Sequence, residues 1–137
     1  MGRKPIIRHF LACEEIERSL IGRHYSLHNL IHAFVLRPDD LFPRIEPEIA
    51  LYAVLTDAVG VHPFTIELVT WDEEGQEEEL FQSRVAMVEL GDDPLVVHGW
   101  PIRLHNLPFP HTGLYEFRLR CDGEIVAQES IRWRDES

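Results

Sequence analysis

Histidine is the residue type in this sequence with the clearest capacity for chemistry, because eight of the 137 residues are histidines and imidazole is a common metal ligand. His24, His28 and His32 are spaced four residues apart. On a helix, side chains at this spacing lie on one face and can converge on one ion. On a strand, neighbouring histidines would lie roughly 13 Å apart, too far to share an ion. The surrounding β-branched and aromatic residues favour a strand, so we expect no metal site here.

Carboxylates are the second candidate set of ligands. Residues 72–79 carry six of them around one glycine, and hard cations such as calcium select oxygen ligands. The run lacks the D-x-[DN]-x-[DN]-G spacing of a calcium loop. We expect an exposed hairpin tip, because burying six carboxylates would carry a large desolvation cost. An alternative is calcium bound by several loops at one end of the domain, to which this tip would contribute together with Asp39, Asp40, Asp92 and Asp93.

No motif for catalysis or nucleotide binding is present. The patterns G-x-S-x-G, G-x-x-x-x-G-K-[ST], G-x-G-x-x-G and H-E-x-x-H are all absent from the sequence. Cys13 and Cys121 lie far apart and form no C-x-x-C pair, so we expect two buried free thiols. The sequence predicts no catalytic residues, no cofactor and no metal site, and we expect a protein that is not an enzyme.

The elements that carry these residues show the period of two that is typical of strands. Residues 115–121 alternate apolar and polar side chains, Asp122-Gly123 follows as a tight-turn pair, and residues 124–134 alternate again. An Asp-Gly pair between two alternating runs is a strong hairpin signal, because a type I′ turn needs positive φ at both positions. We therefore expect an antiparallel hairpin here, with residues 115–121 half-buried.

Further strands are expected at residues 5–13, 25–36, 48–57, 64–71, 80–90 and 95–107. Two of these, residues 5–13 and 48–57, are apolar on both faces and therefore belong inside a sheet. Residues 13–20 suit a short helical turn, and Pro101 places its segment at an edge, at a bulge or between two short strands. The sequence predicts one all-β domain over residues 1–137: an antiparallel β-sandwich of about eight strands, immunoglobulin-like or C2-like.

Charge and hydropathy restrict the partners. Thirteen basic residues against twenty-four acidic ones give a formal net charge of −11, which disfavours nucleic acids and anionic membranes. No apolar run approaches the roughly 20 residues of a spanning helix. Arg8 and His9 interrupt the apolar stretch near the start, so no secretion signal is expected and the sequence predicts a cytoplasmic protein.

Three segments carry a resemblance to a known group of proteins: residues 8–15 (RHFLACEE), residues 25–31 (YSLHNLI) and residues 110–117 (PHTGLYEF), which lead into Asp122-Gly123-Glu124. The sequence resembles an uncharacterised bacterial family of short, single-domain proteins. The resemblance implies a β-rich domain of unknown function and transfers no catalytic residue. Residues 113–115 are also similar to the late strand of immunoglobulin-like domains, where a corner tyrosine bonds back to the chain.

The function that these observations favour is a non-enzymatic binding or scaffolding module. Strand edges and loops of a sandwich can engage another protein or a second copy of the same chain. The expected edge lies near Pro101, and its interaction residues would be Val96, Val97, Trp100 and Ile102.

One alternative is a metal- or ligand-dependent protein, including an enzyme, that uses histidines and loop carboxylates at one end of the sandwich. His98, His105 and His111 would take part only if neighbouring strands brought them together.

Overall fold

A computed structural model describes residues 4–19, 24–35 and 41–134, and every regular element in these residues is a strand. The ten strands, in chain order, are β1 (Ile6–Arg18), β2 (Tyr25–Leu30), β3 (Ala33–Val35), β4 (Arg44–Thr56), β5 (Val61–Trp71), β6 (Glu77–Gln82), β7 (Ala86–Glu89), β8 (His98–Phe109), β9 (Gly113–Cys121) and β10 (Glu124–Arg134). Among the described residues, no helix is long and apolar enough to cross a membrane.

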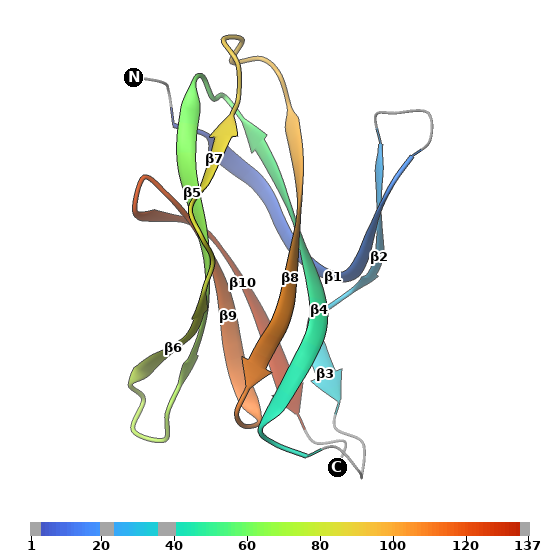
Figure 1. The fold of residues 1–137 in the computed structure, drawn as a ribbon, viewed down its shortest axis with the longest axis vertical. Coiled ribbons are helices and arrows are strands. Elements are labelled where there is room, and N and C mark those ends of the chain that lie inside the picture. Colours follow the sequence, from blue (N-terminus) through green and yellow to red (C-terminus); the bar gives the residue numbers. More distant parts are fainter. Residues whose placement is uncertain (1–3, 20–23, 36–40, 135–137) are drawn as a thin grey trace.

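The strands form two sheets that face each other (Figure 1). Sheet A has the order β2-β1-β4-β8, and sheet B has the order β3-β10-β9-β5-β6, with β7 pairing the first part of β5. All neighbours are antiparallel except β3 and β10, which run parallel. The predicted all-β class is therefore confirmed, and β1 and β4 are interior strands as their two apolar faces predict.

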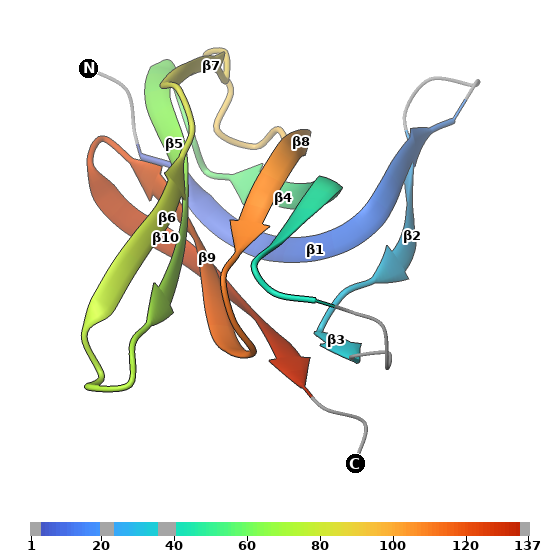
Figure 2. The ribbon, with the colours of Figure 1, turned by 60° about the horizontal axis from the view of Figure 1, so that its bottom comes forward.

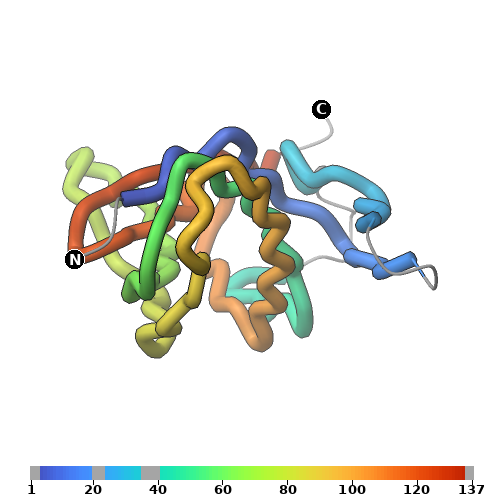
Figure 3. Tube along the Cα trace, turned by 90° about the horizontal axis from the view of Figure 1, so that it is seen from above, coloured from blue at the N-terminus to red at the C-terminus, as the bar shows by residue number. Residues whose placement is uncertain are grey.

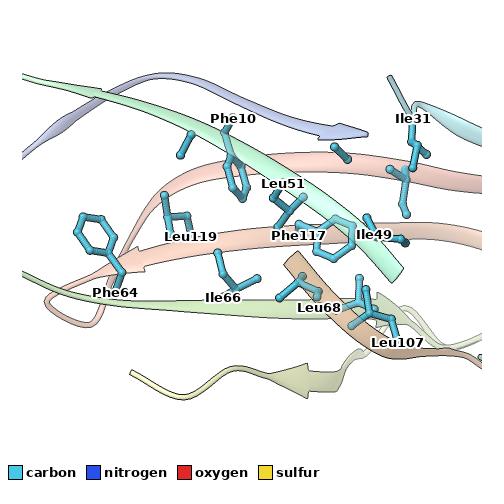
Figure 4. Close-up of a cluster of buried hydrophobic side chains, with 14 of the residues drawn as sticks. Phe10, Ile31, Ile49, Leu51, Phe64, Ile66, Leu68, Leu107, Phe117 and Leu119 are labelled. Atoms are coloured by element: carbon cyan, nitrogen blue, oxygen red, sulfur yellow. The ribbon is translucent and has the colours of Figure 1, made fainter. Parts of the chain in front are cut away.

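The main core lies between the two sheets because each strand turns alternate apolar residues inward (Figure 4). Along β5 the residues Phe64, Ile66 and Leu68 are buried, and they meet Phe117 and Leu119 of β9. The other face of β9 is more covered than the sequence predicts. Glu116 and Arg118 are nearly buried there, because their side chains pair with each other and Arg118 also pairs with Glu77 of β6.

Ten strands replace the expected eight because two predicted strands are each divided. The first part of residues 25–36 pairs with β1 in sheet A as β2, and the end pairs with β10 in sheet B as β3. Residues 80–90 divide at Ser83, whose hydroxyl accepts a hydrogen bond from the backbone N–H of Ile66, so that β6 and β7 both pair with β5. The alternation of apolar and polar residues does not show with which other strand a strand pairs.

The chain around residue 15 is strand, where the sequence suits a short helical turn. β1 continues to Arg18 because its last part pairs with β2, residue Glu15 lying opposite His28. Figure 2 shows β1 as a long, strongly curved strand with β2 beside its far end. Tertiary pairing therefore overrides the local helical spacing of this segment.

The β9–β10 hairpin and the acidic tip have the predicted form. Asp122 and Gly123 have φ angles of 53° and 83°, as a type I′ turn requires. Residues 72–79 are exposed, and residues 72–76 join β5 to β6. Glu77, Glu78 and Glu79, which the sequence places in the tip, already pair with β5 as the start of β6. The turn is closed by the Asp72 carboxylate, which accepts hydrogen bonds from the backbone N–H groups of Glu74 and Gln76.

Candidate functional site

β8 is the outer strand of sheet A, and among the described strands it forms a ladder only with β4. Its register runs from His98 opposite Leu55 to Phe109 opposite Arg44 without a shift, so Pro101 does not break it. Proline lacks an N–H group. A strand can therefore include a proline without losing a hydrogen bond to its paired strand only where the proline nitrogen points away from that strand. The sequence leaves open an edge strand, a bulge or two short strands at Pro101, and in the structure Pro101 lies on an edge strand.

The four predicted interaction residues divide into two groups. Val96 and Val97 precede β8 and are 43% and 64% exposed. Trp100 and Ile102 lie on β8 and pack against the main core, with the Trp100 ring 5.2 Å from the ring of Phe64. Trp100 and Ile102 therefore contact the core while staying partly exposed, whereas the two valines are exposed.

Sequence reasoning missed further exposed apolar residues at the same end of the molecule, where Figure 3 shows the β7–β8 connection beside the start of β5. Leu95 is 85% exposed on this connection. Met87 of β7 lies opposite Pro63, and Val61 of β5 lies opposite Glu89, so Val61 and Met87 are diagonal neighbours on the outer face of sheet B. We call this set the apolar rim: Val61, Val85, Met87, Leu95, Val96 and Val97.

Acidic groups lie next to the apolar rim. A shallow hollow beside it is lined by Gly60, Val61, Glu89, Gly91 and Asp92. Two backbone hydrogen bonds fix the start of the β7–β8 connection against the residue before β5. The N–H of Gly60 donates to the carbonyl of Gly91, and the N–H of Leu90 donates to the carbonyl of Gly60. Two carboxylates, those of Glu89 and Asp92, therefore lie next to the apolar rim, where backbone hydrogen bonds fix the chain.

The structure does not bring together the metal ligands that the sequence suggests. His28 is exposed and lies 3.0 Å from the Glu17 carboxylate, and His24 and His32 are also exposed. Asp92 lies near the start of β5, whereas the acidic tip follows its end, so the length of an eleven-residue strand, roughly 35 Å, separates them. Asp39 and Asp40 lie outside the described residues.

A different cluster is formed by His62, Cys121 and Asp122, whose ligand atoms all lie within 4.8 Å of one another. It is the only such group of three among the described residues. His62 Nδ1 is 3.2 Å from Asp122 Oδ2, and Cys121 Sγ is 3.6 Å from the same oxygen. Burial, followed by the adjacent Asp122 carboxylate, raises the pKa of the Cys121 thiol to about 12.

Sequence reasoning missed this cluster because His62 lies on β5, whereas Cys121 ends β9 and Asp122 follows in the turn. His62 stands fifty-nine positions before Cys121, and they meet only because β5 pairs with β9 so that Phe64 lies opposite Cys121. The sequence does place Asp122 in a tight turn through the hairpin motif. It does not show which strand lies beside that turn, because this depends on the order of strands in the sheet.

The fold defines the class of the protein first: an all-β domain of two mostly antiparallel sheets. The chain belongs to the family of unknown function DUF6941, whose model matches residues 10–134. The resemblance to an uncharacterised family of β-rich proteins is thereby confirmed. No curated protein matches the chain in sequence.

Among solved structures, the chain is similar to the Pseudomonas fluorescens alkylpurine DNA glycosylase AlkC bound to DNA containing an abasic site analog. The TM-score is 0.52 and the sequence identity is 11%. The match covers 95% of this chain but 30% of the glycosylase chain, so this chain spans about a third of that protein's length. The likeness concerns the fold alone.

Proposed function

We propose that this chain is a non-enzymatic binding module that docks an extended segment of another protein at the apolar rim and along the edge strand β8. The observation that carries this proposal is the position of Val96 and Val97: these exposed rim residues lead directly into β8, whose outer edge pairs with no other described strand. An exposed apolar group beside an open edge suits a partner that supplies both a strand and apolar side chains.

The charge of the molecule favours a basic partner segment. Glu89 and Asp92 line the hollow beside Val61, and the whole chain has a formal net charge of −11. Lysine or arginine side chains flanking an apolar stretch would be attracted to this end, whereas a second copy of the chain or a nucleic acid would be repelled.

Pro101 gives this edge its selectivity. The proline offers no N–H to a partner strand, so a continuous ladder along β8 is interrupted at that residue. A partner therefore gains only a short ladder and needs the apolar rim for the rest of its affinity. This combination disfavours indiscriminate strand addition and favours a segment with apolar residues at the right positions.

An immunoglobulin-like type and a cytoplasmic location are part of the proposal. Tyr115 supports the fold type, because its hydroxyl donates to the backbone carbonyl of His111 at 2.5 Å and accepts from the His111 N–H, an arrangement similar to a tyrosine corner. The free thiols of Cys13 and Cys121 support a reducing compartment, where unpaired cysteines are the rule.

The test is a nuclear magnetic resonance titration of the ¹⁵N-labelled full chain with two synthetic peptides of equal length. Both carry the same apolar residues, one flanked by lysines and the other by glutamates. We expect the lysine peptide to shift the amide resonances of the apolar rim and of β8, and the Val97→Ser variant to weaken binding. The matched control is Leu30→Ser, which removes an exposed leucine from β2 at the other edge of sheet A.

Equal responses to the two peptides would overturn the proposal, as would shifts centred on β2. So would equal weakening by the Val97 and Leu30 substitutions, because nonspecific attraction to an acidic protein would then explain the binding.

A further inference from the structure

The turn between β9 and β10 is fastened to the start of β5. The backbone N–H of Asp122 donates to the carbonyl of Pro63 at 3.1 Å, and Cys121 lies opposite Phe64 in the sheet. These two contacts place the side chains of Cys121 and Asp122 beside His62. His62 and Cys121 are buried, whereas the Asp122 side chain is 35% exposed and opens the cluster to solvent.

The backbone places a proton on one of the two ring nitrogens of His62. Its Nε2 lies 2.9 Å from the backbone carbonyl oxygen of Val59, and because a carbonyl only accepts, Nε2 must carry a proton. His62 Nδ1 lies 3.2 Å from Asp122 Oδ2, and these two atoms can share either a proton or a metal ion. Histidines that bind metals typically donate their other ring N–H to a carbonyl or carboxylate in this way.

Two of the three donor separations fit a tetrahedral ion, and the third, between His62 Nδ1 and Cys121 Sγ, is within 4.8 Å. With Zn–N and Zn–O bonds of about 2.0 Å and a Zn–S bond of about 2.3 Å, adjacent donor atoms lie about 3.3 to 3.6 Å apart. The observed separations from Asp122 Oδ2 are 3.2 Å to His62 Nδ1 and 3.6 Å to Cys121 Sγ. We propose that His62, Cys121 and Asp122 form a binding site for a divalent transition-metal ion of the zinc type.

The donor set selects the class of ion. A thiolate and an imidazole favour zinc or a similar transition metal over calcium or magnesium, which prefer oxygen ligands alone. Water from the exposed side of Asp122 takes the fourth position. Binding releases the thiol proton to solvent, and the sulfur lone pair forms the bond to the metal.

The ion would have a structural effect that is independent of the apolar rim. It would join β5 to the turn that connects β9 and β10, and so link the central strands of sheet B. Lys4 lies near the site, but its ammonium group is paired with the Glu124 carboxylate at 3.0 Å. The Glu124 carboxylate therefore partly balances the positive charge of Lys4, which would otherwise repel an entering cation.

The test uses the full chain, purified without an affinity tag, treated with chelator, and titrated with Co²⁺ and then Zn²⁺. Tetrahedral Co²⁺ reports its ligands through visible ligand-field bands and a near-ultraviolet thiolate-to-cobalt charge-transfer band. We expect both signals to saturate at one equivalent and to disappear when Zn²⁺ displaces Co²⁺. Zn²⁺ should also raise the melting temperature.

Variants identify the ligands. Cys121→Ser should abolish the charge-transfer band, and His62→Gln and Asp122→Asn should weaken binding by about tenfold or more. The matched controls are Cys13→Ser, which removes the other buried thiol, and His28→Gln, which removes an exposed histidine beside a carboxylate. Circular dichroism shows whether each variant is folded, and Asp122→Asn changes only an exposed turn residue, so it keeps the test informative if a core variant unfolds.

The proposal is overturned if the wild-type chain gives no thiolate band with Co²⁺. It is equally overturned if Cys13→Ser removes the band while Cys121→Ser keeps it, or if folded Asp122→Asn binds as tightly as the wild type. None of these results would bear on peptide binding at the apolar rim.

Discussion

Cys13 and Cys121 are both fully buried, yet the regions around them differ. Cys13 lies on sheet A in a second, smaller cluster with Ile16 and Ala50, partly covered by Tyr25, Leu27 and Tyr52. Cys121 belongs to the main core between the sheets, and its sulfur lies beside the Asp122 carboxylate. We refer to these regions as the Cys13 cluster and the Cys121 end of the main core.

The comparison shows that burial alone does not give a thiol a role. Burial raises the pKa of both thiols, because a buried thiolate loses its hydration. Cys13 packs with Ile16 and Ala50 and belongs to no group of three potential metal ligands among the described residues, so it serves as a small hydrophobic residue. Cys121 has a carboxylate and an imidazole within reach, so the same burial presents its sulfur to a potential ion. The polar neighbours therefore decide the difference.

The largest expected effect is at the Cys121 end of the main core. Phe64 lies opposite Cys121, and its ring packs edge-on against Trp100 at 5.2 Å. Phe64→Ala should lower the free energy of unfolding by about 3–5 kcal/mol, because it leaves a large cavity between the two sheets. Urea denaturation measures this loss. A loss below about 1 kcal/mol would show that this end is loosely packed.

A smaller loss is expected in the Cys13 cluster. Ile16→Ala should cost about 2 kcal/mol, at the low end for such a change, because few residues surround the site and they can close over the gap. The variant should also make Cys13 react faster with a thiol reagent while leaving Cys121 as slow as before. Mass mapping of the alkylated cysteines tests this, and equal acceleration at both thiols would contradict the separation of the two clusters.

The two regions also differ in how far the sequence predicts them. Alternation identifies Phe64, Phe117 and Leu119 as inward-facing, because a regular strand fixes the faces of its residues. Burial of Ile16 follows instead from pairing of the last part of β1 with β2, where local spacing favours a helical turn.

The functional residues show the same limit. Asp122 is placed by its turn motif, but its proximity to His62 depends on the order of strands in sheet B, which one sequence does not report. Exposure of Met87 likewise depends on β7 pairing with β5. Local pattern predicts faces and turns, whereas sites built across strands require the topology.

Gly99 offers a way to disturb the Cys13 cluster from outside. A Cβ at this residue would lie 2.1 Å from the hydroxyl oxygen of Tyr52, one of the residues that cover Cys13. Gly99→Ala should therefore displace the Tyr52 ring and cost about 1–2 kcal/mol. Adding Tyr52→Phe removes the clashing oxygen and should recover part of the loss. A double-mutant cycle measures the coupling, and fully additive losses would show that the contact does not limit the cluster.

The smallest expected effect is a pH dependence that distinguishes the two thiols in chelator-treated protein. The pKa of the Cys121 thiol is about 12 in the folded chain and about 9 in a free thiol, so its contribution to stability is complete below pH 9 and is lost as the pH rises toward 12. The stability advantage of the wild type over Cys121→Ala should shrink by about 1.4 kcal/mol between pH 8 and pH 10, because this window includes one full pH unit above the pKa of the unfolded thiol and each unit corresponds to about 1.4 kcal/mol. The stability difference between the wild type and Cys13→Ala should change less with pH. Burial raises the pKa of the Cys13 thiol without help from a carboxylate, and a backbone hydrogen bond from Glu15 favours the thiolate.

Urea denaturation across this pH range measures the stability difference for each variant. A larger change for Cys13→Ala than for Cys121→Ala would contradict the conclusion that Cys121 has the more polar surroundings.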